Sequence, residues 1–231
     1  MGTDMKHNGS RNICHSTAKV TGVILAGGHS SRMGSNKALL PFKGGLFIEV
    51  IYRQLCELFD EVLIVTNAPE QFSSLPCRKV ADIYPDVGAL AGLHAGLYHS
   101  NNNHIFAVAC DMPYLNSSLI SRLVSLRDQA DVVIPQGDKG LEPLHALYGK
   151  ACLPPMERAL TGNQQRIVSF FSEVRVYNFS CGDVAALDPG FDSFKNINTP
   201  SDYFGLRADE RSTDVMESSV GGMCRLKKTH G

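Results

Sequence analysis

The sequence predicts an α/β fold in which a mostly parallel sheet is covered by helices on both faces. Strand-like and helix-like segments alternate along most of the chain, and this alternation is typical of such sheets. The run at 105–110 (IFAVAC) is entirely apolar, as expected of a parallel strand that is buried on both faces. A glycine-rich loop follows the first strand-like run, at the kind of position where open α/β folds bind their ligands.

Short runs of β-branched and other apolar residues mark the expected strands. The first run ends at Gly27-Gly28, which indicates a turn. A short extended piece is also expected just before the break at Gly44-Gly45. In chain order, the expected extended segments are 20–26, 38–42, 61–66, 79–81, 105–110, 132–135, 144–148 and 174–179.

Helices are predicted between most of these strands. In the first helix, Ile48, Ile51 and Leu55 recur at the spacing of an amphipathic helix. A later helix is expected to begin at Asn116 or Ser117, because both residue types cap helix N-termini. The expected helices are 46–59, 90–98, 116 or 117 to 127, 150–160 and 166–171.

Composition limits the class of protein. The chain has 231 residues, 43% of them hydrophobic, and its 22 basic and 23 acidic side chains give a net charge of −1. This balance argues against an electrostatic nucleic-acid binder. No apolar run approaches the roughly 20 residues that span a bilayer, so a membrane protein is not expected. We expect one domain at 20–206, with a polar N-terminal extension at 1–19 and a polar, disordered tail at 207–231.

Cysteine and histidine usage points away from disulfides and transition metals. The seven cysteines are scattered and form no C-x-x-C pair, and the eight histidines show no metal-binding spacing. The sequence therefore favours the reducing cytoplasm.

The glycine-rich loop at 25–40 (LAGGHSSRMGSNKALL) carries the clearest functional signal. Its glycines let the backbone turn sharply and expose N–H groups to phosphate oxygens, while Arg32 and Lys37 supply positive charge. It is neither a Walker loop nor a G-x-G-x-x-G fingerprint. The alternative is a solvent-exposed Gly/Ser loop, but we favour phosphate binding.

Two acidic residues follow expected strands. Asp111 leaves the buried 105–110 strand, where a carboxylate suits Mg²⁺ and nucleotide phosphates, although Asp111-Met112-Pro113 also fits an ordinary strand exit. Asp82 binds a ligand or caps a turn. His145 is interpreted as structural.

Further polar and aromatic residues have two interpretations. Asn196 and Asn198 lie two apart on an extended segment and either bind a ligand or satisfy turn backbone. The aromatic residues Tyr148, Phe170 and Phe171 are expected in the core.

The order of these motifs resembles the molybdenum cofactor guanylyltransferases, the MobA family. The matching segments are L-A-G-G-x-S-x-R-M-G-x-x-K, an Asp before G-A-L-A-G, C-D-M-P, Q-R-I-V-S-F-F and N-x-N-T-P. They run in order through about residues 20–206. The glycine loop alone is shared with many nucleotidyltransferases, whereas the combination is more particular to this family.

The resemblance implies a Rossmann-like nucleotidyltransferase fold and transfer of GMP from GTP to the terminal phosphate of molybdenum-molybdopterin. The products are the guanine dinucleotide cofactor and pyrophosphate. The implied catalytic residues are Lys37, Asp111 and Arg32, with Asp111 as the Mg²⁺ ligand. The implied nucleotide-binding residues are Leu25, Ala26, Gly27, Gly28, Lys37, Thr66 or Asn67, Asp82 and Asp111. The implied pterin-side residues are Arg166, Asn196 and Asn198.

The expected partners are GTP, molybdenum-molybdopterin, other cofactor-biosynthesis proteins and acceptor molybdoenzymes, and a monomer is expected. One departure from the family is Asn36, which stands where an Asp usually precedes the loop lysine. If that position only shapes the loop, Asn serves equally; if it bears on metal or lysine charge, activity is weakened. The rival functions are a cytidylyltransferase, another small-molecule nucleotidyltransferase, or a non-catalytic nucleotide-binding protein.

Overall fold

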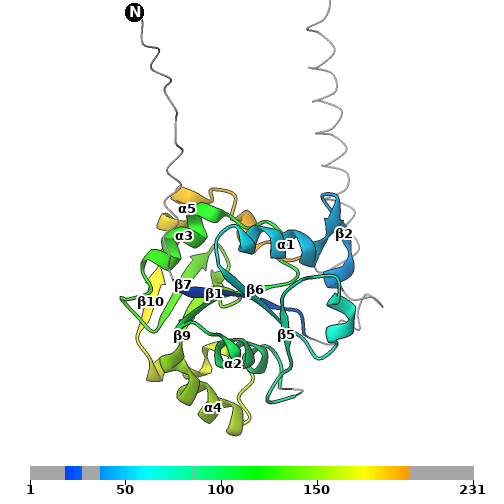
Figure 1. The fold of residues 1–231 in the computed structure, drawn as a ribbon. Helices are drawn as coiled ribbons and strands as arrows, with labels where there is room; N and C mark the ends of the chain where they lie inside the picture. Colours follow the sequence, from blue (N-terminus) through cyan, green and yellow to red (C-terminus); the bar gives the residue numbers. More distant parts are fainter. Residues whose placement is uncertain (1–18, 28–36, 86, 198–231) are drawn as a thin grey trace, which may run out of the picture.

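The computed structural model describes residues 19–27, 37–85 and 87–197, and Figure 1 draws this part in colour. Its centre is an eight-stranded sheet with the strand order β10-β7-β9-β6-β1-β4-β5, and β8 pairs with β7. The strands of this sheet are β1 (Val20–Leu25), β4 (Glu61–Val65), β5 (Arg78–Val80), β6 (His104–Ala109), β7 (Val132–Gly137), β8 (Gly140–Leu141), β9 (His145–Gly149) and β10 (Val176–Phe179).

Strand β1 lies in the middle of the sheet and pairs in parallel with both β4 and β6. The exception to the parallel arrangement along this order is β9, which lies between β6 and β7 and is antiparallel to both. The predicted mostly parallel α/β sheet is therefore confirmed. Its carboxyl edge, where β1, β4, β5 and β6 end, is the edge to which the sequence assigned ligand binding.

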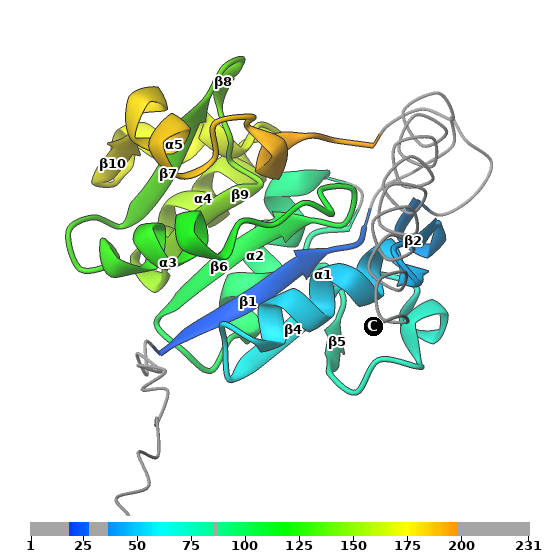
Figure 2. The ribbon, with the colours of Figure 1, turned by 90° about the horizontal axis from the view of Figure 1, so that it is seen from above.

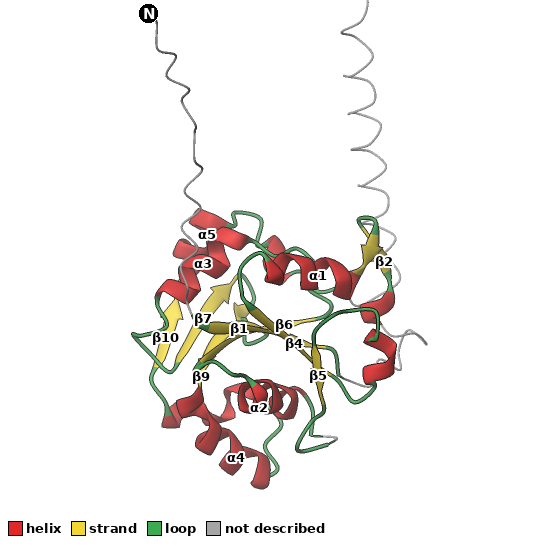
Figure 3. Ribbon diagram, viewed as in Figure 1, coloured by secondary structure: helices red, strands yellow, loops and turns green. Residues whose placement is uncertain are grey.

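Helices cover both faces of the sheet (Figures 1 and 3). On one face lie α1 (Phe47–Cys56), α3 (Ser117–Ser125) and α5 (Cys181–Leu187), which Figure 2 shows in front of the strands. On the other face lie α2 (Ala89–His99) and α4 (Leu153–Thr161). The buried residues correspondingly form two large apolar clusters, one on each side of the sheet.

Local sequence explains how two of these helices are placed. Asn116 is the cap of α3, because its side chain accepts hydrogen bonds from the amides of Ser118 and Leu119, both at 3.0 Å. Helix α2 packs very closely on the sheet at Gly96, where an added Cβ would lie 2.6 Å from Cγ1 of Val23. A glycine at this position therefore sets the separation between α2 and β1.

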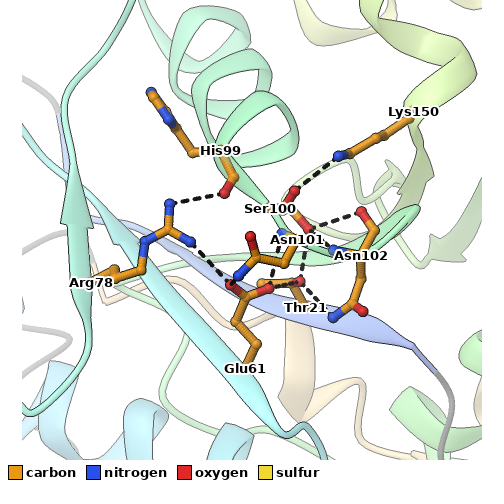
Figure 4. Close-up of polar contacts among 8 residues, drawn as sticks. All are labelled: Thr21, Glu61, Arg78, His99, Ser100, Asn101, Asn102 and Lys150. Carbon is orange, nitrogen blue, oxygen red and sulfur yellow. Dashed lines mark hydrogen bonds and ion pairs between the residues drawn. The ribbon is translucent and has the colours of Figure 1, made fainter.

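A polar network fixes the opposite, amino edge of the sheet (Figure 4). Buried Thr21 donates to Glu61 at 2.5 Å and shares a 2.7 Å hydrogen bond with Ser100. Asn101 adds a side-chain hydrogen bond to Glu61 at 2.6 Å, and Arg78 adds an ion pair at 3.2 Å. These contacts join the end of α2 to the starts of β1, β4 and β5.

Two expected segments differ from the prediction. The extended piece at 38–42 is wrong in its first half, which forms the 3-10 helix η1 (Lys37–Leu39); only β2 (Pro41–Phe42) is extended, and it pairs with β3 (Gly45–Leu46). The tight turn of this hairpin has positive φ at Lys43 and Gly44. The 166–171 segment is helical but of the 3-10 type, as η4 (Ile167–Glu173).

Several short elements were not predicted. They are β3, β8, α5 and the 3-10 helices η2 (Pro69–Phe72) and η5 (Asp192–Phe194), whereas the expected helix at 150–160 begins with the 3-10 turn η3 (Lys150–Cys152) before α4. Apart from Lys19, the predicted N-terminal extension and tail lie outside the described residues, and the limits of the domain stay a prediction. Within the described ranges, no helix combines the length and hydropathy that crossing a membrane would require.

Candidate nucleotide-binding site

Backbone hydrogen bonds align the residues that leave the carboxyl edge of the sheet. The amide of Ala26 donates to the carbonyl of Val65 at 2.9 Å. The amide of Cys110 donates to the carbonyl of Leu25 at 3.2 Å. The amide of Thr66 continues the row by donating to the last residue of β5 at 2.8 Å. The residues that follow β1, β4 and β6 therefore lie side by side, as the predicted site requires.

Asn67 and Asp82 form a two-point hydrogen-bonded pair beside this row. The Asn67 Nδ2 donates to Oδ2 of Asp82 at 3.3 Å, and the Asp82 amide donates to Oδ1 of Asn67 at 3.0 Å. The side chain of Thr66, in contrast, is buried and accepts a hydrogen bond from the amide of Ala68 at 3.1 Å. Of the two alternatives after β4, Asn67 is the residue with an exposed side chain.

The start of α2 brings this pair against the end of β1. A Cβ placed on Gly92 would lie 3.6 Å from Oδ1 of Asp82 and 3.6 Å from Cδ2 of Leu25. Leu25 is buried, Ala26 is half-buried and Gly27 is exposed. The chain therefore becomes exposed to solvent at Gly27, directly after the end of β1 that Gly92 and Asp82 border.

Asp111 lies on the other side of β1 and meets a segment from much later in the chain. The amide of Ile197 donates to the carbonyl of Asp111 at 3.0 Å. Ile197 itself is buried in a small cluster with Phe42 and Phe47. This contact places exposed Asn196 beside the Asp111 loop, so the structure brings these two predicted site residues together.

The segment 188–197 extends from the end of α5 to the Asp111 loop. The Asp188 carboxylate accepts hydrogen bonds from the amides of Asp192 (3.2 Å) and Ser193 (2.9 Å), which form the start of η5. Figure 2 shows the segment in orange, running from α5 toward the loop that follows β6.

Arg166 occupies a different part of the molecule. It is exposed, precedes η4, and lines an open hollow of about 550 Å³ together with Arg158 and Ser169. Among the interactions within the described ranges, no hydrogen bond or ion pair joins Arg166 to Asp111 or Asn196. Its predicted pterin-side role stays a prediction.

Four of the predicted site residues cannot be placed fully. Gly28, Arg32 and Asn198 lie outside the described residues. So does Asn36, which is not a predicted site residue but the position that departs from the family pattern. Lys37 begins η1, but its side chain is likewise outside them. The phosphate-binding role of the loop therefore stays a prediction.

The aromatic residues follow the structural interpretation. His145 is fully buried between the rings of Phe106 (5.0 Å) and Phe194 (5.2 Å), and burial lowers its pKa to about 3. Tyr148 and Phe170 are fully buried in the core, and Phe171 is half-buried against it.

Sequence reasoning missed one acidic residue at the carboxyl edge. Glu142 is half-buried next to β7, and burial together with nearby Asp138 raises its pKa to about 7. The local signal was the acidic residue of the run E-P-L at 142–144, which lies directly before β9.

The carboxylate at this edge suits a hard cation that is held mainly by nucleotide phosphates and waters and only partly by the protein. Within the described ranges, no group of three or more His, Cys, Asp or Glu side chains is close enough to hold a metal ion. Asp111 instead offers carboxylate oxygens alone, and Mg²⁺ in nucleotide sites binds through one or two carboxylates, phosphates and waters. Asp111 therefore fits the Mg²⁺ role.

A mostly parallel sheet with acidic residues after β5 and β6 and a glycine-rich sequence after β1 is typical of α/β nucleotide-binding enzymes. The pattern of the MobA-like NTP transferase domain matches residues 22–176. The chain belongs to this family of enzymes.

Individual relatives agree with this placement. The chain is 36% identical over 182 residues to the molybdenum cofactor guanylyltransferase of Desulfosudis oleivorans, covering 78% of this chain and 90% of the relative. It superposes with a TM-score of 0.73 on the crystal structure of molybdopterin-guanine dinucleotide biosynthesis protein A from Archaeoglobus fulgidus, with 26% identity over 84% of this chain and all of that one. A nucleotidyl transferase from Methanothermobacter, 23% identical with a TM-score of 0.61, covering 84% of this chain and 98% of that one, shares the fold.

Proposed function

We propose that this enzyme transfers GMP from GTP to the terminal phosphate of molybdenum-molybdopterin, giving the guanine dinucleotide cofactor and pyrophosphate. The observation that carries the proposal is the contact between Ile197 and Asp111, because it joins the N-I-N segment to the C-D-M-P loop. The relatives named for this reaction support it, since they match the chain over most of their own length.

The nucleotide is expected to bind over β1, β4 and β5. Guanine needs an acceptor for its ring N1–H and its exocyclic amine, and a donor for O6. The exposed backbone at Gly27 offers both kinds of group, and the Asp82 carboxylate is a further acceptor. Asn67 holds this carboxylate from the side.

The phosphates are expected to lie between the glycine loop and Asp111. Lys37 and Arg32 neutralise triphosphate charge through charge-assisted hydrogen bonds. Asp111 would hold Mg²⁺, which when bound stabilises negative charge on the α-phosphate. Asp111 is half-buried, and this limits the access of competing water to its carboxylate.

The chemistry requires positioning more than a protein base. A terminal phosphate oxygen of molybdopterin attacks the α-phosphorus of GTP, the bond from that phosphorus to the bridging oxygen of the β-phosphate breaks, and pyrophosphate leaves. The attacking phosphate is already largely ionised at neutral pH, because its second pKa is about 6. In-line alignment and charge neutralisation are therefore expected to supply most of the rate.

The acceptor is expected beyond Asp111, toward Asn196, with Asn198 and Arg166 contributing. A monomer in the cytoplasm that hands its product to acceptor molybdoenzymes completes the proposal.

A single product assay tests the proposed reaction. The protein is incubated with GTP, Mg²⁺ and molybdenum-molybdopterin, and the dinucleotide is identified by mass while pyrophosphate is counted. The proposal expects one pyrophosphate per dinucleotide, and none when molybdopterin is omitted. GTP binding without pyrophosphate release would instead support a non-catalytic nucleotide-binding protein.

A further inference from the structure

Glu142 lies in the turn that leads into β9 at the carboxyl edge, since its carbonyl accepts a hydrogen bond from the amide of His145 at 3.1 Å. Strands β6 and β9 pair antiparallel from His104↔Gly149 to Val108↔His145. One further hydrogen bond, from the amide of Ala109 to the carbonyl of Leu144 at 3.2 Å, extends this register beyond the ladder. Beyond this bond both chains turn, so Glu142 and Asp111 each lie two residues past the last paired residues, at the same end of β6 and β9.

The surroundings of Glu142 leave room for its carboxylate at that edge. Its amide donates to the carbonyl of Pro135 at 3.0 Å, which fixes the backbone against β7. A Cβ on Gly137 would lie 3.0 Å from Oε1 of Glu142 and 2.9 Å from Cδ2 of Phe194. Only glycine at 137 therefore lets the carboxylate and the phenyl ring approach the strand together.

The Glu142 carboxylate is an acceptor that the fold does not use. Within the part of the chain that the structure describes, no hydrogen-bond donor reaches it, although it is half-buried. The nearest charges are Asp138, which disfavours its ionised form, and Lys139, which favours it. Partial burial of an unpaired carboxylate costs stability, so a role in ligand binding would explain why this cost is present.

The strand order assigns Glu142 to the acceptor half of the edge. The proposed guanine contacts lie over β1, β4 and β5, while β9 and β7 lie beyond β6 on the other side. The 188–197 segment crosses this second half, with Phe194 beside Gly137 and Ile197 bonded to Asp111. Glu142 and Asn196 therefore belong to the half that remains for the second substrate.

We propose that Glu142 is a specificity-determining residue that accepts hydrogen bonds from the pterin ring of the acceptor. A 2-amino-4-oxo pterin presents its N3–H and one amino N–H in the same direction, and the two oxygens of a carboxylate accept such a pair. The inference rests on the proposed function, because that function supplies the pterin.

Two matched substitutions test this assignment. Glu142→Gln keeps the size of the side chain and removes its charge, and Asp138→Asn does the same at the neighbouring, exposed carboxylate. We expect Glu142→Gln to raise the KM for molybdopterin at least about tenfold, as for loss of a charge-assisted contact. The KM for GTP should stay near the wild-type value and the thermal midpoint should not fall. Asp138→Asn removes a charge that disfavours the ionised form of Glu142, so it should leave the KM for GTP unchanged and should not raise the KM for molybdopterin.

Equilibrium binding separates this inference from the proposed reaction. Metal-free molybdopterin is titrated into each protein without nucleotide, and the intrinsic fluorescence of the pterin is followed. Weaker binding by Glu142→Gln, with partial recovery in Glu142→Asp, supports the assignment even if no guanylyl transfer is found. Equal pterin affinity in Glu142→Gln and wild type overturns it, as does a KM increase shared equally by GTP and molybdopterin.

Discussion

The pair formed by Asn67 and Asp82 allows the nucleotide half of the site to be tested quantitatively. If Asn67 acts by orienting the Asp82 carboxylate, the two residues should not act independently. We therefore consider Asn67→Ala, Asp82→Ala and the double variant, each assayed with GTP, CTP and ATP at saturating molybdopterin. Asp82→Ala should lower both the rate with GTP and the preference for it.

The magnitude follows from the two hydrogen bonds. Their lengths are 3.3 Å and 3.0 Å, and both residues lie at the surface, so each contributes at the low end of the usual range. With about 0.5–1.5 kcal/mol per bond, Asn67→Ala should lower kcat/KM for GTP by about 1–2 kcal/mol, or roughly five- to thirtyfold. The double variant should lose about 1 kcal/mol less than the sum of the single losses.

A matched control lies at the opposite edge of the sheet. Asn101 is also an exposed asparagine bonded to a carboxylate, that of Glu61, at 2.6 Å (Figure 4). Asn101→Ala should lower the free energy of unfolding about as much as Asn67→Ala does, and it should leave the preference for GTP unchanged. Additive losses in the Asn67 and Asp82 cycle, or an unaltered GTP preference in Asp82→Ala, would refute the reasoning.

The remaining predictions concern the metal, the loop lysine and the packing of α2. Asp111→Asn should keep the fold, lose most activity and show a steeper Mg²⁺ dependence; near wild-type turnover at limiting Mg²⁺ would exclude Asp111 as the ligand. Lys37→Ala should weaken GTP use by roughly 1.5–3 kcal/mol without a matching loss of stability, and unchanged kinetics would make it a solvated loop charge. Gly96→Ala should lower the free energy of unfolding by about 1–2 kcal/mol, because its Cβ would lie 2.6 Å from Val23 and overpacking outweighs helix propensity. In Gly92→Ala the nearest neighbours of the new Cβ lie at 3.6 Å, so the urea midpoint of unfolding should stay unchanged or rise slightly. Equal changes in the urea midpoint at both glycines would contradict this account.

The long apolar and amphipathic segments were predictable because their signals are local. The all-apolar run of β6 and the spacing of α1 need no knowledge of the rest of the chain. Helix α5 was missed because it has seven residues and buries only Val184. Its start did carry a signal, since Ser180 accepts a hydrogen bond from the amide of Asp183 at 3.2 Å.

The site was predictable only in part, because its contacts depend on topology. Asp82 and Asp111 were found from their positions after strands and Asn196 from the N-x-N spacing, and the family resemblance supplied the pterin-side role of Asn196. The contact of Ile197 with Asp111 joins residues far apart in sequence, and no local pattern encodes it. Glu142 was missed for a related reason: its place at the same sheet edge as Asp111 depends on β9 pairing antiparallel between β6 and β7.

Base selectivity is the most direct test of guanylyl transfer. The measurement is kcat/KM for GTP, CTP and ATP in the wild-type protein at saturating molybdenum-molybdopterin, followed by pyrophosphate release. A site that hydrogen-bonds one base leaves buried polar groups unpaired with another, and this can produce discrimination of about 10⁴. We predict a strong preference for GTP over both other nucleotides. Equal or better use of CTP would contradict guanylyl transfer and favour cytidylyl transfer to the same acceptor.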